Sequence, residues 1–505
     1  MREYLAAIDQ GTTGTRCILF DTEGRAVSSC HREHRQIFPR PGWVEHDPAE
    51  IWSRVVETVR GAIGDAPRGR VIAIGVTNQR ETIVAWDVRD GQPMAPAIVW
   101  QDTRTAPECQ AAIEKGWGPD VLSRTGLPIS TYFSATKIRW LMDHAPELRE
   151  RARAGHLRVG TVDSWVIWNL TGGPRGGAHV TDPTNATRTL LCNLDRLEWD
   201  PVLLDLFGVE PSLLPLIQPS IAREPYGLTP PDGAFDSGVP ICGDLGDQQA
   251  ALFGQCCFAP GEAKNTYGTG CFLLEHVGSR PVRSASGLLA TAAAAGAGAR
   301  AYALEGSVAI AGAAVQWLRD NLGLVSSAPE TEAIARSVPD TGGVFFVPAF
   351  AGLFAPHWDM TARGAIVGLT GFSNRAHLVR ATLEAICFQS REVADAMARD
   401  GGRPLQTLKV DGGATGNDLL MQMQADILGL PVVRPVVRET TALGAAFAAG
   451  LAVGALESTD ALRRHWKADR VFEPEWNADR RESAFRGWRR AVDRARGWVD
   501  EKSAG

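Results

Sequence analysis

The chain is 505 residues long, which exceeds what one hydrophobic core can serve and predicts two large domains or three smaller ones. Hydrophobic residues make up 44% of the chain and charged residues 22%, and the net charge of −6 contains no long run of one sign. These values exclude a basic surface for nucleic acid or for an anionic membrane. A bound phosphate would therefore have to be held by backbone amides and a metal.

Nine cysteines are scattered through the chain without a Cys-x-x-Cys pair. An odd number in this pattern argues against a disulfide framework and against a structural zinc site. The first residues enter a strand pattern directly, without the apolar stretch of a signal peptide, and no apolar run is long enough for a membrane span. We therefore expect a cytoplasmic protein.

The first part of the chain reads as a hairpin followed by a helix and more strands. An apolar strand over 4–9 leads into a turn of glycine and threonine, and a second strand covers 17–20. Apolar spacing predicts a helix over 48–63. Further apolar runs predict strands at 71–76, 82–86 and 97–100. This order indicates a mixed α/β layer.

A similar hairpin appears in the second half of the chain. Strands over 263–267 and 271–274 flank a glycine-threonine turn, and the residues from Thr266 match those from Asp9 with one deletion. Such a short match leaves chance and domain duplication both open at this point.

The division between the two halves is expected near residue 250, which gives domains at 1–250 and 251–505. The preceding segment 211–240 is rich in proline and glycine, as is typical of a boundary region.

Apolar spacing also predicts the remaining elements of the second half. They are helices over 307–320, 376–398, 417–428 and 442–450, and strands over 344–348 and 407–410. A last helix carries an aromatic stripe that we expect in the core, formed by Phe485, Trp488, Val492 and Trp498.

Three turns that combine glycine and threonine each follow an apolar strand, at Gly11–Gly14, Gly268–Gly270 and Gly412–Thr415. Glycine lets the backbone approach a ligand closely, so that consecutive N–H groups can converge on an anion, and threonine adds a hydroxyl donor. One such turn alone is typical of an ordinary hairpin. Three together, two of them led by an aspartate, favour phosphate binding.

Two aspartates stand beside these features. Asp9 ends a strand next to the first turn, where a carboxylate suits a hydrated Mg²⁺ that keeps several of its waters. Asp247 lies between an apolar run and a helical segment, where it serves either as a metal or base group or as a simple helix cap. Spacing alone leaves both interpretations open.

Other nucleotide motifs do not fit. The chain has no Gly-x-x-x-x-Gly-Lys-Ser/Thr loop and lacks the catalytic-loop residues of protein kinases. The segment Gly296–Ala301 has the spacing of a dinucleotide-binding turn. Strand-like residues flank it and no helix follows, so we interpret it as a hairpin turn.

Six longer stretches carry a more specific signal. They include Asp-Gln-Gly-Thr-Thr at 9–13, Pro-Gly-Trp-Val-Glu-His-Asp at 41–47 and Thr-Asn-Gln-Arg-Glu-Thr at 77–82, with further stretches at 246–255, 264–272 and 440–446. Over nearly the whole chain the sequence resembles the FGGY carbohydrate kinases, and among them those that act on glycerol. The resemblance implies an α/β fold of two duplicated ribonuclease-H-like domains, as in actin and hexokinase, with the active site in the cleft between them.

The resemblance also implies ATP and Mg²⁺ as cofactors, glycerol as the substrate, and a homo-oligomer that is a dimer or a tetramer. Asp247 would be the general base, and Asp9 and Asp247 would hold Mg²⁺ through water. The implied substrate-binding residues are Arg80, Glu81, Trp100, Tyr132, Asp247, Gln248 and Phe272. The implied nucleotide-binding residues are Thr12, Thr13, Arg16, Thr269, Gly312, Gln316, Gly413 and Asn417.

The sequence departs from the family in two places. Gly14 replaces a serine that is usual after the paired threonines, and the segment 229–236 has no lysine or histidine. Some members bind fructose 1,6-bisphosphate or are phosphorylated on histidine in that region, so neither form of regulation is expected here.

Two rival functions stay open. One is another FGGY kinase that acts on a longer polyol or ketose, such as erythritol or xylulose. The other is a nucleotide-switched binding protein of the actin type, which would phosphorylate no small molecule. The charged pair Arg80 and Glu81, together with Trp100 and Phe272, favours the three-carbon substrate.

Overall fold

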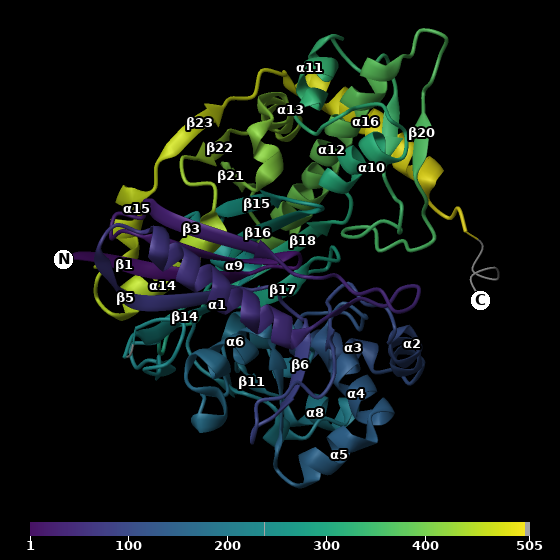
Figure 1. Cartoon of the computed structure of the whole chain (residues 1–505). Coiled ribbons are helices and arrows are strands. Elements are labelled where there is room, and N and C mark those ends of the chain that lie inside the picture. Colours follow the sequence, from purple (N-terminus) through teal and green to yellow (C-terminus); the bar gives the residue numbers. More distant parts are fainter. Residues whose placement is uncertain (237, 500–505) are drawn as a thin grey trace.

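The computed structural model describes residues 1–236 and 238–499, and Figure 1 shows the course of the chain. The first large sheet has the strand order β13 (Gly227–Leu228), β14 (Pro240–Gly246), β5 (Gly69–Asn78), β1 (Arg2–Gln10), β2 (Gly14–Phe20) and β3 (Ala26–Glu33). The second has the order β17 (Leu289–Ala292), β18 (Tyr302–Val308), β16 (Cys271–Gly278), β15 (Ala263–Tyr267), β21 (Leu408–Asp411), β22 (Val432–Pro435) and β23 (Ala468–Phe472).

A third sheet has the order β4 (Glu45–His46), β7 (Ala97–Ile98), β6 (Ile83–Asp87) and β8 (Leu157–Thr161). Short strand pairs join β10 (Cys192–Asn193) to β11 (Glu198–Trp199), β12 (Leu216–Ile217) to β9 (Val180–Thr181), and β19 (Phe345–Val347) to β20 (Ala365–Val367).

The helices of the first part of the chain are α1 (Pro48–Asp65), α2 (Ala106–Glu114), α3 (Gly118–Thr125), α4 (Ser134–His144), α5 (Pro146–Arg153), α6 (Val162–Leu170), α7 (Pro183–Ala186), α8 (Pro201–Phe207) and α9 (Asp247–Gly254). Those of the second part are α10 (Gly312–Asp320), α11 (Glu330–Arg336), α12 (Arg375–Gly401), α13 (Asp418–Leu428), α14 (Thr440–Ala452), α15 (Thr459–His465) and α16 (Ala478–Ala495). Within the described residues, no helix combines the length and the apolar character that crossing a membrane would require.

The two large sheets have the same topology. In the first, β1 pairs antiparallel with β2 and parallel with β5, while β2 pairs with β3 and β5 with β14. In the second, β15 pairs antiparallel with β16 and parallel with β21, while β16 pairs with β18 and β21 with β22. The weak repeat between the two hairpins therefore marks the first hairpin of each sheet, and the expected two-domain α/β fold is confirmed.

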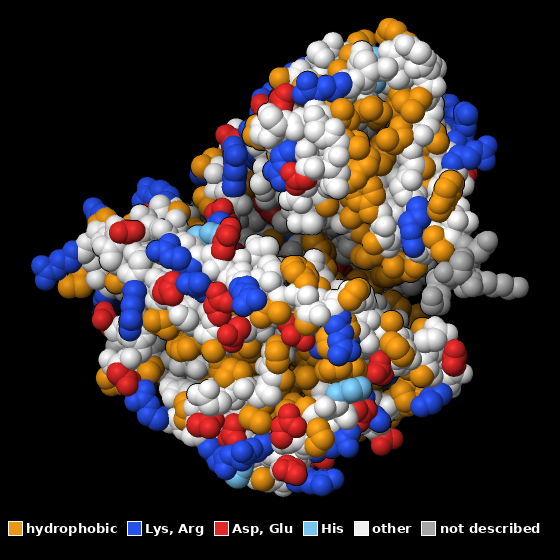
Figure 2. Space-filling model, turned by 45° about the vertical axis from the view of Figure 1, so that its right-hand side comes forward, with side chains coloured by type: hydrophobic (Ala, Val, Ile, Leu, Met, Phe, Trp, Pro, Cys, Tyr) orange, Lys and Arg blue, Asp and Glu red, His pale blue; other side chains and the backbone are white. Residues whose placement is uncertain are grey.

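We call residues 2–246, which carry the first and third sheets, the first lobe. Residues 263–435 and 468–495, which carry the second sheet and its helices, form the second lobe. Figure 1 shows the second lobe above and the blue segment of the first lobe below, and Figure 2 shows a hollow between the upper and lower parts of the molecule. The boundary near residue 250 stays a proposal, and it falls within α9, between the last strand of one sheet and the first strand of the other.

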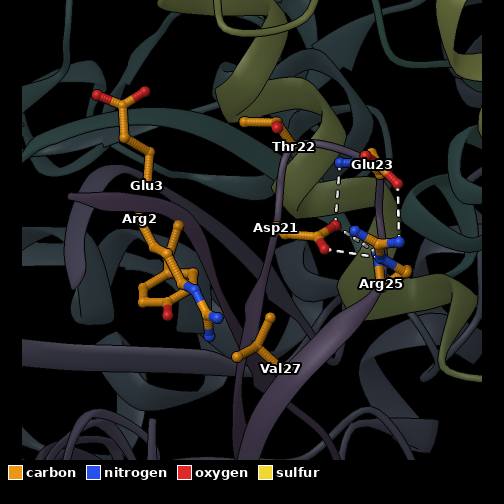
Figure 3. Close-up of a pocket in the computed structure, with 8 residues that line it drawn as sticks. Arg2, Glu3, Asp21, Thr22, Glu23, Arg25 and Val27 are labelled. Atoms are coloured by element: carbon orange, nitrogen blue, oxygen red, sulfur yellow. Dashed lines mark hydrogen bonds and ion pairs between the residues drawn. The ribbon is translucent and has the colours of Figure 1, made fainter. Parts of the chain in front are cut away.

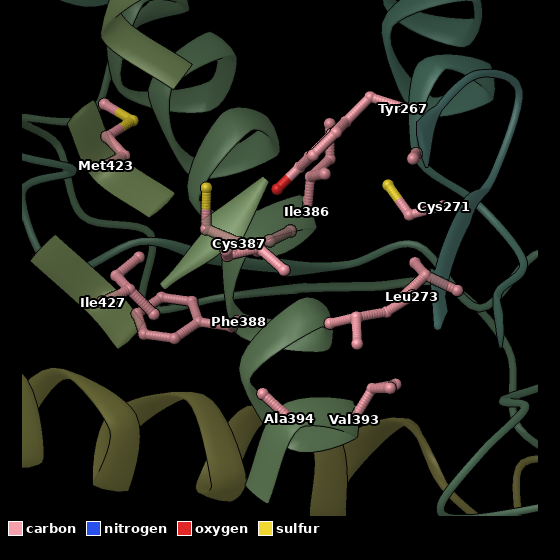
Figure 4. Packing of buried hydrophobic residues seen from close by; sticks show 14 of the residues in the cluster. Tyr267, Cys271, Leu273, Ile386, Cys387, Phe388, Val393, Ala394, Met423 and Ile427 are labelled. Carbon is pink, nitrogen blue, oxygen red and sulfur yellow. The ribbon is translucent and has the colours of Figure 1, made fainter. Parts of the chain in front are cut away.

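The long helix α12 forms the centre of the second lobe's core. Its residues Ile386, Cys387 and Phe388 are buried beside Leu273 of β16 (Figure 4). On the other side, the ring of Phe388 stacks on that of Trp488, with the centroids 5.4 Å apart. The aromatic stripe of the tail helix is thus core at Phe485, Trp488 and Val492.

Three of the predictions about elements were wrong. Trp498 is 72% exposed, because α16 ends at Ala495 before this residue could turn inward. The helix predicted from 307 begins at Gly312, since the residues up to Val308 pair as strand β18. The segment 211–240 is not a boundary region, because its strand β13 pairs with β14 inside the first sheet.

Helix α9 follows β14 of the first sheet, and helix α14 follows β22 of the second sheet. The two helices cross where the lobes meet. Helix α14 packs against α9 and also on strands β1, β5 and β14 of the first sheet. A Cβ atom added to Gly444 would lie 1.9 Å from the carbonyl oxygen of Ala250, and one added to Gly254 would lie 2.0 Å from that of Thr440. The helix backbones are therefore in direct contact, which only glycine permits.

We expect Gly444→Ala to lower the free energy of unfolding by at least about 1–3 kcal/mol, because the two backbones would have to separate. Thermal and urea unfolding would measure the loss. Gly64→Ala is the matched control, since Gly64 lies in α1 with open space around its Cα, and it should gain about 0.5–1 kcal/mol. Equal stability of Gly444→Ala and the parent would contradict the close crossing.

Candidate active site

The second and third glycine turns lie side by side, because β15 and β21 are neighbouring parallel strands whose carboxyl ends meet. Gly412 has φ +90°, and a Cβ atom on it would lie 2.4 Å from the carbonyl oxygen of Tyr267. The turn after β21 is thus pressed against the end of β15, and only glycine fits there.

The turn after β15 also meets the start of α10. The amide of Gly312 donates to the carbonyl oxygen of Gly268 at 3.1 Å, and the amide of Ala313 donates to that of Thr269 at 3.0 Å. Gln316 lies one turn further along α10 and is exposed. The structure thus brings Thr269 and Gly312 together, with Gln316 on the adjoining surface.

The predicted nucleotide residues beyond β21 lie in the turn that leads to α13 and at the N-cap of that helix. Gly413 is exposed, and Asn417 is the N-cap of the helix, where its side-chain oxygen accepts from the amide of Leu420 at 2.9 Å. The side-chain nitrogen Nδ2 of Asn417 donates to the hydroxyl of Thr331 on α11 at 3.2 Å. Asn417 therefore has a structural partner on both sides of its side chain.

The first glycine turn is tied to two segments that are distant in sequence. Its Thr13 is exposed, while the Thr12 hydroxyl accepts from Nε1 of Trp100 at 2.9 Å. Arg16, just past the turn, forms an ion pair with Glu439, which directly precedes α14. The hairpin of the first lobe is thus linked to the start of α14.

Asp9 lies one residue before the end of strand β1, opposite Arg16. The pKa of Asp9 is raised to about 7, mainly by burial. The positive charge of Arg16 lowers this pKa, and the carboxylates of Asp247 and Glu439 raise it. The carboxylates of Asp247 and Glu439 thus lie close enough to repel that of Asp9. Such a place suits a cation, which would relieve the repulsion.

Among residues 1–236 and 238–499, no group of three or more His, Cys, Asp or Glu side chains converges to chelate a metal directly. Mg²⁺ does not require such a group, because it usually keeps several waters and binds one or two carboxylates together with phosphate oxygens. Asp9 and Asp247 therefore fit a hydrated Mg²⁺ that arrives with a nucleotide.

Arg80 and Glu81 follow β5 and are buried, with 3% and 1% of their surfaces exposed. Nε of Arg80 lies 3.1 Å from Oδ1 of Asp247, the first residue of α9. Glu81 has φ +63°, a left-handed backbone that is uncommon outside glycine. Strain of this kind is concentrated at functional sites, where the surrounding contacts hold it in place.

The backbone before Asp247 is fixed from the first lobe. The hydroxyl of Thr184 accepts from the amide of Gly246 at 2.8 Å and itself donates to Asp182 at 2.8 Å. This contact sets where α9 begins. The carboxylate of Asp247 remains 30% exposed, so it is the accessible acid of the cluster.

Gln248 connects this aspartate to a lysine that the sequence did not single out. Its Nε2 donates to Asp247 at 2.9 Å, and its Oε1 accepts from Nζ of Lys264 at 2.6 Å. Lys264 is fully buried, and this burial lowers its pKa to about 8, although Asp411, Asp247 and Glu305 favour its charged form. Lys264 also donates to the carbonyl oxygen of Phe272 at 3.2 Å, which joins that residue to the cluster.

Aromatic side chains border the charged group. The rings of Trp100 and Tyr132 meet edge to face, with centroids 5.5 Å apart and an angle of 83° between their planes. Both are partly exposed, as is Phe272 on β16 of the second lobe. The guanidinium of Arg188, which donates to Glu81, lies 5.5 Å from the centroid of the Tyr132 ring. The charged group therefore lies beside these aromatic side chains.

Two further buried charges join this group and were missed by the sequence reasoning. Glu305 of β18 accepts from Arg80 and from Arg188, and Arg188 also donates to Glu81. Burial would raise the pKa of Glu305, but Arg188 and Arg80 hold it at about 2. A usable signal was present, since Glu305 is the one charged residue in the apolar run 302–308.

A hollow elsewhere carries no comparable chemistry. Figure 3 shows it at the opposite end of β1, between Arg2 and Glu3 and the turn that contains Asp21 and Arg25. Asp21 pairs there with Arg25 at 2.8 Å on the surface. With strands rising about 3.3 Å per residue, this hollow lies roughly 20 Å from Asp9.

Two family models and several known proteins match this chain. The N-terminal domain of the FGGY family of carbohydrate kinases matches residues 4–254, and the C-terminal domain matches residues 263–453. The glycerol kinase of Saccharopolyspora erythraea is 56% identical over 503 residues, which cover 99% of this chain and 100% of that protein.

Solved structures agree as well. The Plasmodium falciparum glycerol kinase with ADP is 38% identical and has a TM-score of 0.91, with 98% of both chains covered. A xylulose kinase from Lactobacillus acidophilus is 24% identical, with a TM-score of 0.86 over 97% of this chain and 98% of that chain. The latter supports the fold alone.

Proposed function

The chain belongs to the FGGY family of carbohydrate kinases, and from this premise we propose that it transfers the γ-phosphoryl group of ATP to a terminal hydroxyl of glycerol. The product would be glycerol 3-phosphate, and the reaction would be the first step in the use of glycerol. The relatives that carry this name, and the ADP in one of their structures, support the choice of substrate and nucleotide.

The observation that carries the proposal is the group of charged side chains beside Trp100 and Tyr132. Glycerol offers three hydroxyls on a short carbon chain. Arg80, Glu81 and Asp247 would hold these hydroxyls through charge-assisted hydrogen bonds, which are stronger than neutral ones. The rings of Trp100, Tyr132 and Phe272 would cover the C–H side and limit the size of the pocket, and Gln248 would fix the acid.

Asp247 would act as the general base. Its carboxylate is the accessible one of the group, and Arg80 and the amide of Gln248 hold Oδ1 at 3.1 and 2.8 Å. It would take the proton of the terminal hydroxyl as the hydroxyl oxygen attacks the γ-phosphorus in line with the leaving oxygen.

The nucleotide would lie between the glycine turns of both lobes. Thr12, Thr13 and Thr269 would offer hydroxyl and amide donors to the phosphates, with Arg16 beside them. Residues from α10 and the turn after β21 would line the rest of its path, namely Gly312, Gln316, Gly413 and Asn417. Mg²⁺, held near Asp9 and Asp247 through water, would neutralise charge on the transferring group.

One assay distinguishes the proposed reaction from its two alternatives, a kinase for a longer polyol or ketose and an actin-type binding protein. We expect ADP release by the purified enzyme to depend on glycerol, with kcat/KM for glycerol at least about tenfold above that for erythritol, xylitol or xylulose. A coupled assay with the panel of alcohols measures this directly. A higher kcat/KM for a four- or five-carbon substrate would overturn the choice of glycerol. Nucleotide binding without phosphorylation of any of these alcohols would favour the actin-type alternative.

The homo-oligomer and the cytoplasmic location stay predictions of the sequence. Sedimentation analysis of the purified protein would test the first, with a dimer or tetramer as the expected result.

A further inference from the structure

We propose that Glu305 and Arg188 are positioning residues of the substrate site, a role that rests on the phosphoryl transfer proposed above. Both are buried with none of their surface exposed. Glu305 would orient Arg80 from the second lobe, and Arg188 would orient Glu81. The site in the first lobe would then be complete only with a carboxylate from the second.

Glu305 holds the guanidinium of Arg80 by both of its outer nitrogens. Nη1 donates to Oε2 at 2.5 Å, and Nη2 donates to Oε1 at 3.1 Å. A bidentate contact of this type fixes the plane of a guanidinium as well as its place. The remaining nitrogen, Nε, then faces Oδ1 of Asp247 at 3.1 Å. Nη1 also donates to Oε1 of Gln249 at 3.2 Å, but only Glu305 holds both outer nitrogens and so sets the orientation of Arg80 toward the proposed base.

Arg188 holds Glu81 by one hydrogen bond and is itself held by another to Glu305. Its Nε donates to Oε1 of Glu81 at 2.6 Å, and its Nη2 donates to Oε1 of Glu305 at 3.1 Å. The backbone of Glu81 is left-handed, and its carbonyl oxygen accepts from the hydroxyl of Ser134 at 3.0 Å. Side-chain and backbone contacts together thus hold a conformation that Glu81 would not adopt alone.

The four charges balance one another. Two guanidinium groups and two carboxylates alternate in a buried network, from Glu81 to Arg188, to Glu305 and to Arg80. A network of this kind is a poor source of stability, because the cost of removing the charges from water offsets their attraction. A role in orientation explains why it is built at the substrate site.

One donor of the network is left over. Among the described residues, Nη1 of Arg188 is buried and has no acceptor. Buried donors are nearly always paired, so this nitrogen is open to a water or to an acceptor that enters the site. If the network served stability alone, an acceptor for this nitrogen would stabilise the protein further.

The test uses the full-length enzyme with Glu305→Gln, which keeps the shape of the side chain and removes its charge. We expect the KM for glycerol to rise and kcat to fall, each by about tenfold or more, because misplaced groups at a reacting centre are costly. The KM for ATP should stay within about twofold of the parent value, since no nucleotide residue contacts the network. Loss of folding alone would not raise the KM for glycerol while leaving the KM for ATP unchanged.

Asp200→Asn is the matched control. Asp200 is equally buried and pairs with Arg124 at 3.2 Å and Arg196 at 3.3 Å, away from the site. It should lose stability without a change in either KM. If Asp200→Asn lost activity in the same pattern as Glu305→Gln, or if Glu305→Gln had parental kinetics, the proposal would be overturned.

Arg188→Lys keeps the buried charge, and it tests the positioning role if Glu305→Gln does not fold. Lysine has one ammonium in place of the forked guanidinium, so Glu81 and Glu305 could not both be held. We expect a folded protein with a raised KM for glycerol, and parental values would refute the role. If the parent enzyme prefers another alcohol, the glycerol proposal fails, and the same variants are then assayed with that alcohol.

Discussion

Replacing Asp247 with asparagine is expected to lower kcat by roughly a hundredfold or more while ATP binding stays largely intact, as loss of a general base would. Asparagine has the same shape and can still accept from the amide of Gln248, which now donates to Oδ1 at 2.8 Å. Its side chain cannot take a proton from an attacking hydroxyl. The contact at Oδ1 is thus kept, while the proton acceptor is lost together with the hydrogen bond that Nε2 of Gln248 donates to Oδ2 at 2.9 Å.

A coupled assay gives kcat, and isothermal titration with ATP gives the nucleotide affinity. Asp143→Asn serves as the control, because Asp143 is an exposed aspartate paired with Arg139 and Arg149 on the surface. It should leave both measurements unchanged. Parental turnover in Asp247→Asn would remove this residue from the proton transfer. An equal loss of ATP affinity would point to metal or nucleotide binding instead.

The glycine turns could be predicted because their conformation depends on residues that are neighbours in sequence. Gly412 shows this well, since its φ of +90° and its contact with Tyr267 leave no space for a side chain. The residues that form such a turn are neighbours in sequence, so composition alone reveals them. The same holds for the apolar strands that lead into the turns.

Features that depend on distant pairing could not be read in this way. Arg188 and Glu305 are 117 residues apart, and neither stands in a motif. The end of β18 was mistaken for a helix, because its strand character comes from pairing with β16 and not from periodicity. Sequence reasoning found the side chains expected to touch the substrate and missed the charges that hold them.

Replacing Arg80 with alanine is expected to raise the KM for glycerol by the equivalent of about 1.5–3 kcal/mol, the usual worth of a hydrogen bond to a charged group. It should also lower the free energy of unfolding by about 3–5 kcal/mol, because Glu305 would keep only one of its two arginines in a buried place. The KM for ATP should change little. Steady-state kinetics with each substrate varied in turn, together with thermal unfolding, separates these effects.

Arg391→Ala is the control that distinguishes substrate binding from stability. The side chain of Arg391 is 10% exposed and pairs with Glu482 at 2.5 Å in the second lobe, between α12 and α16. Its removal should cost stability and leave the KM for glycerol unchanged, since no residue of the substrate site contacts it. If Arg80→Ala raised only the KM for ATP, the charged group beside Trp100 would belong to the nucleotide, and the substrate would have to bind elsewhere.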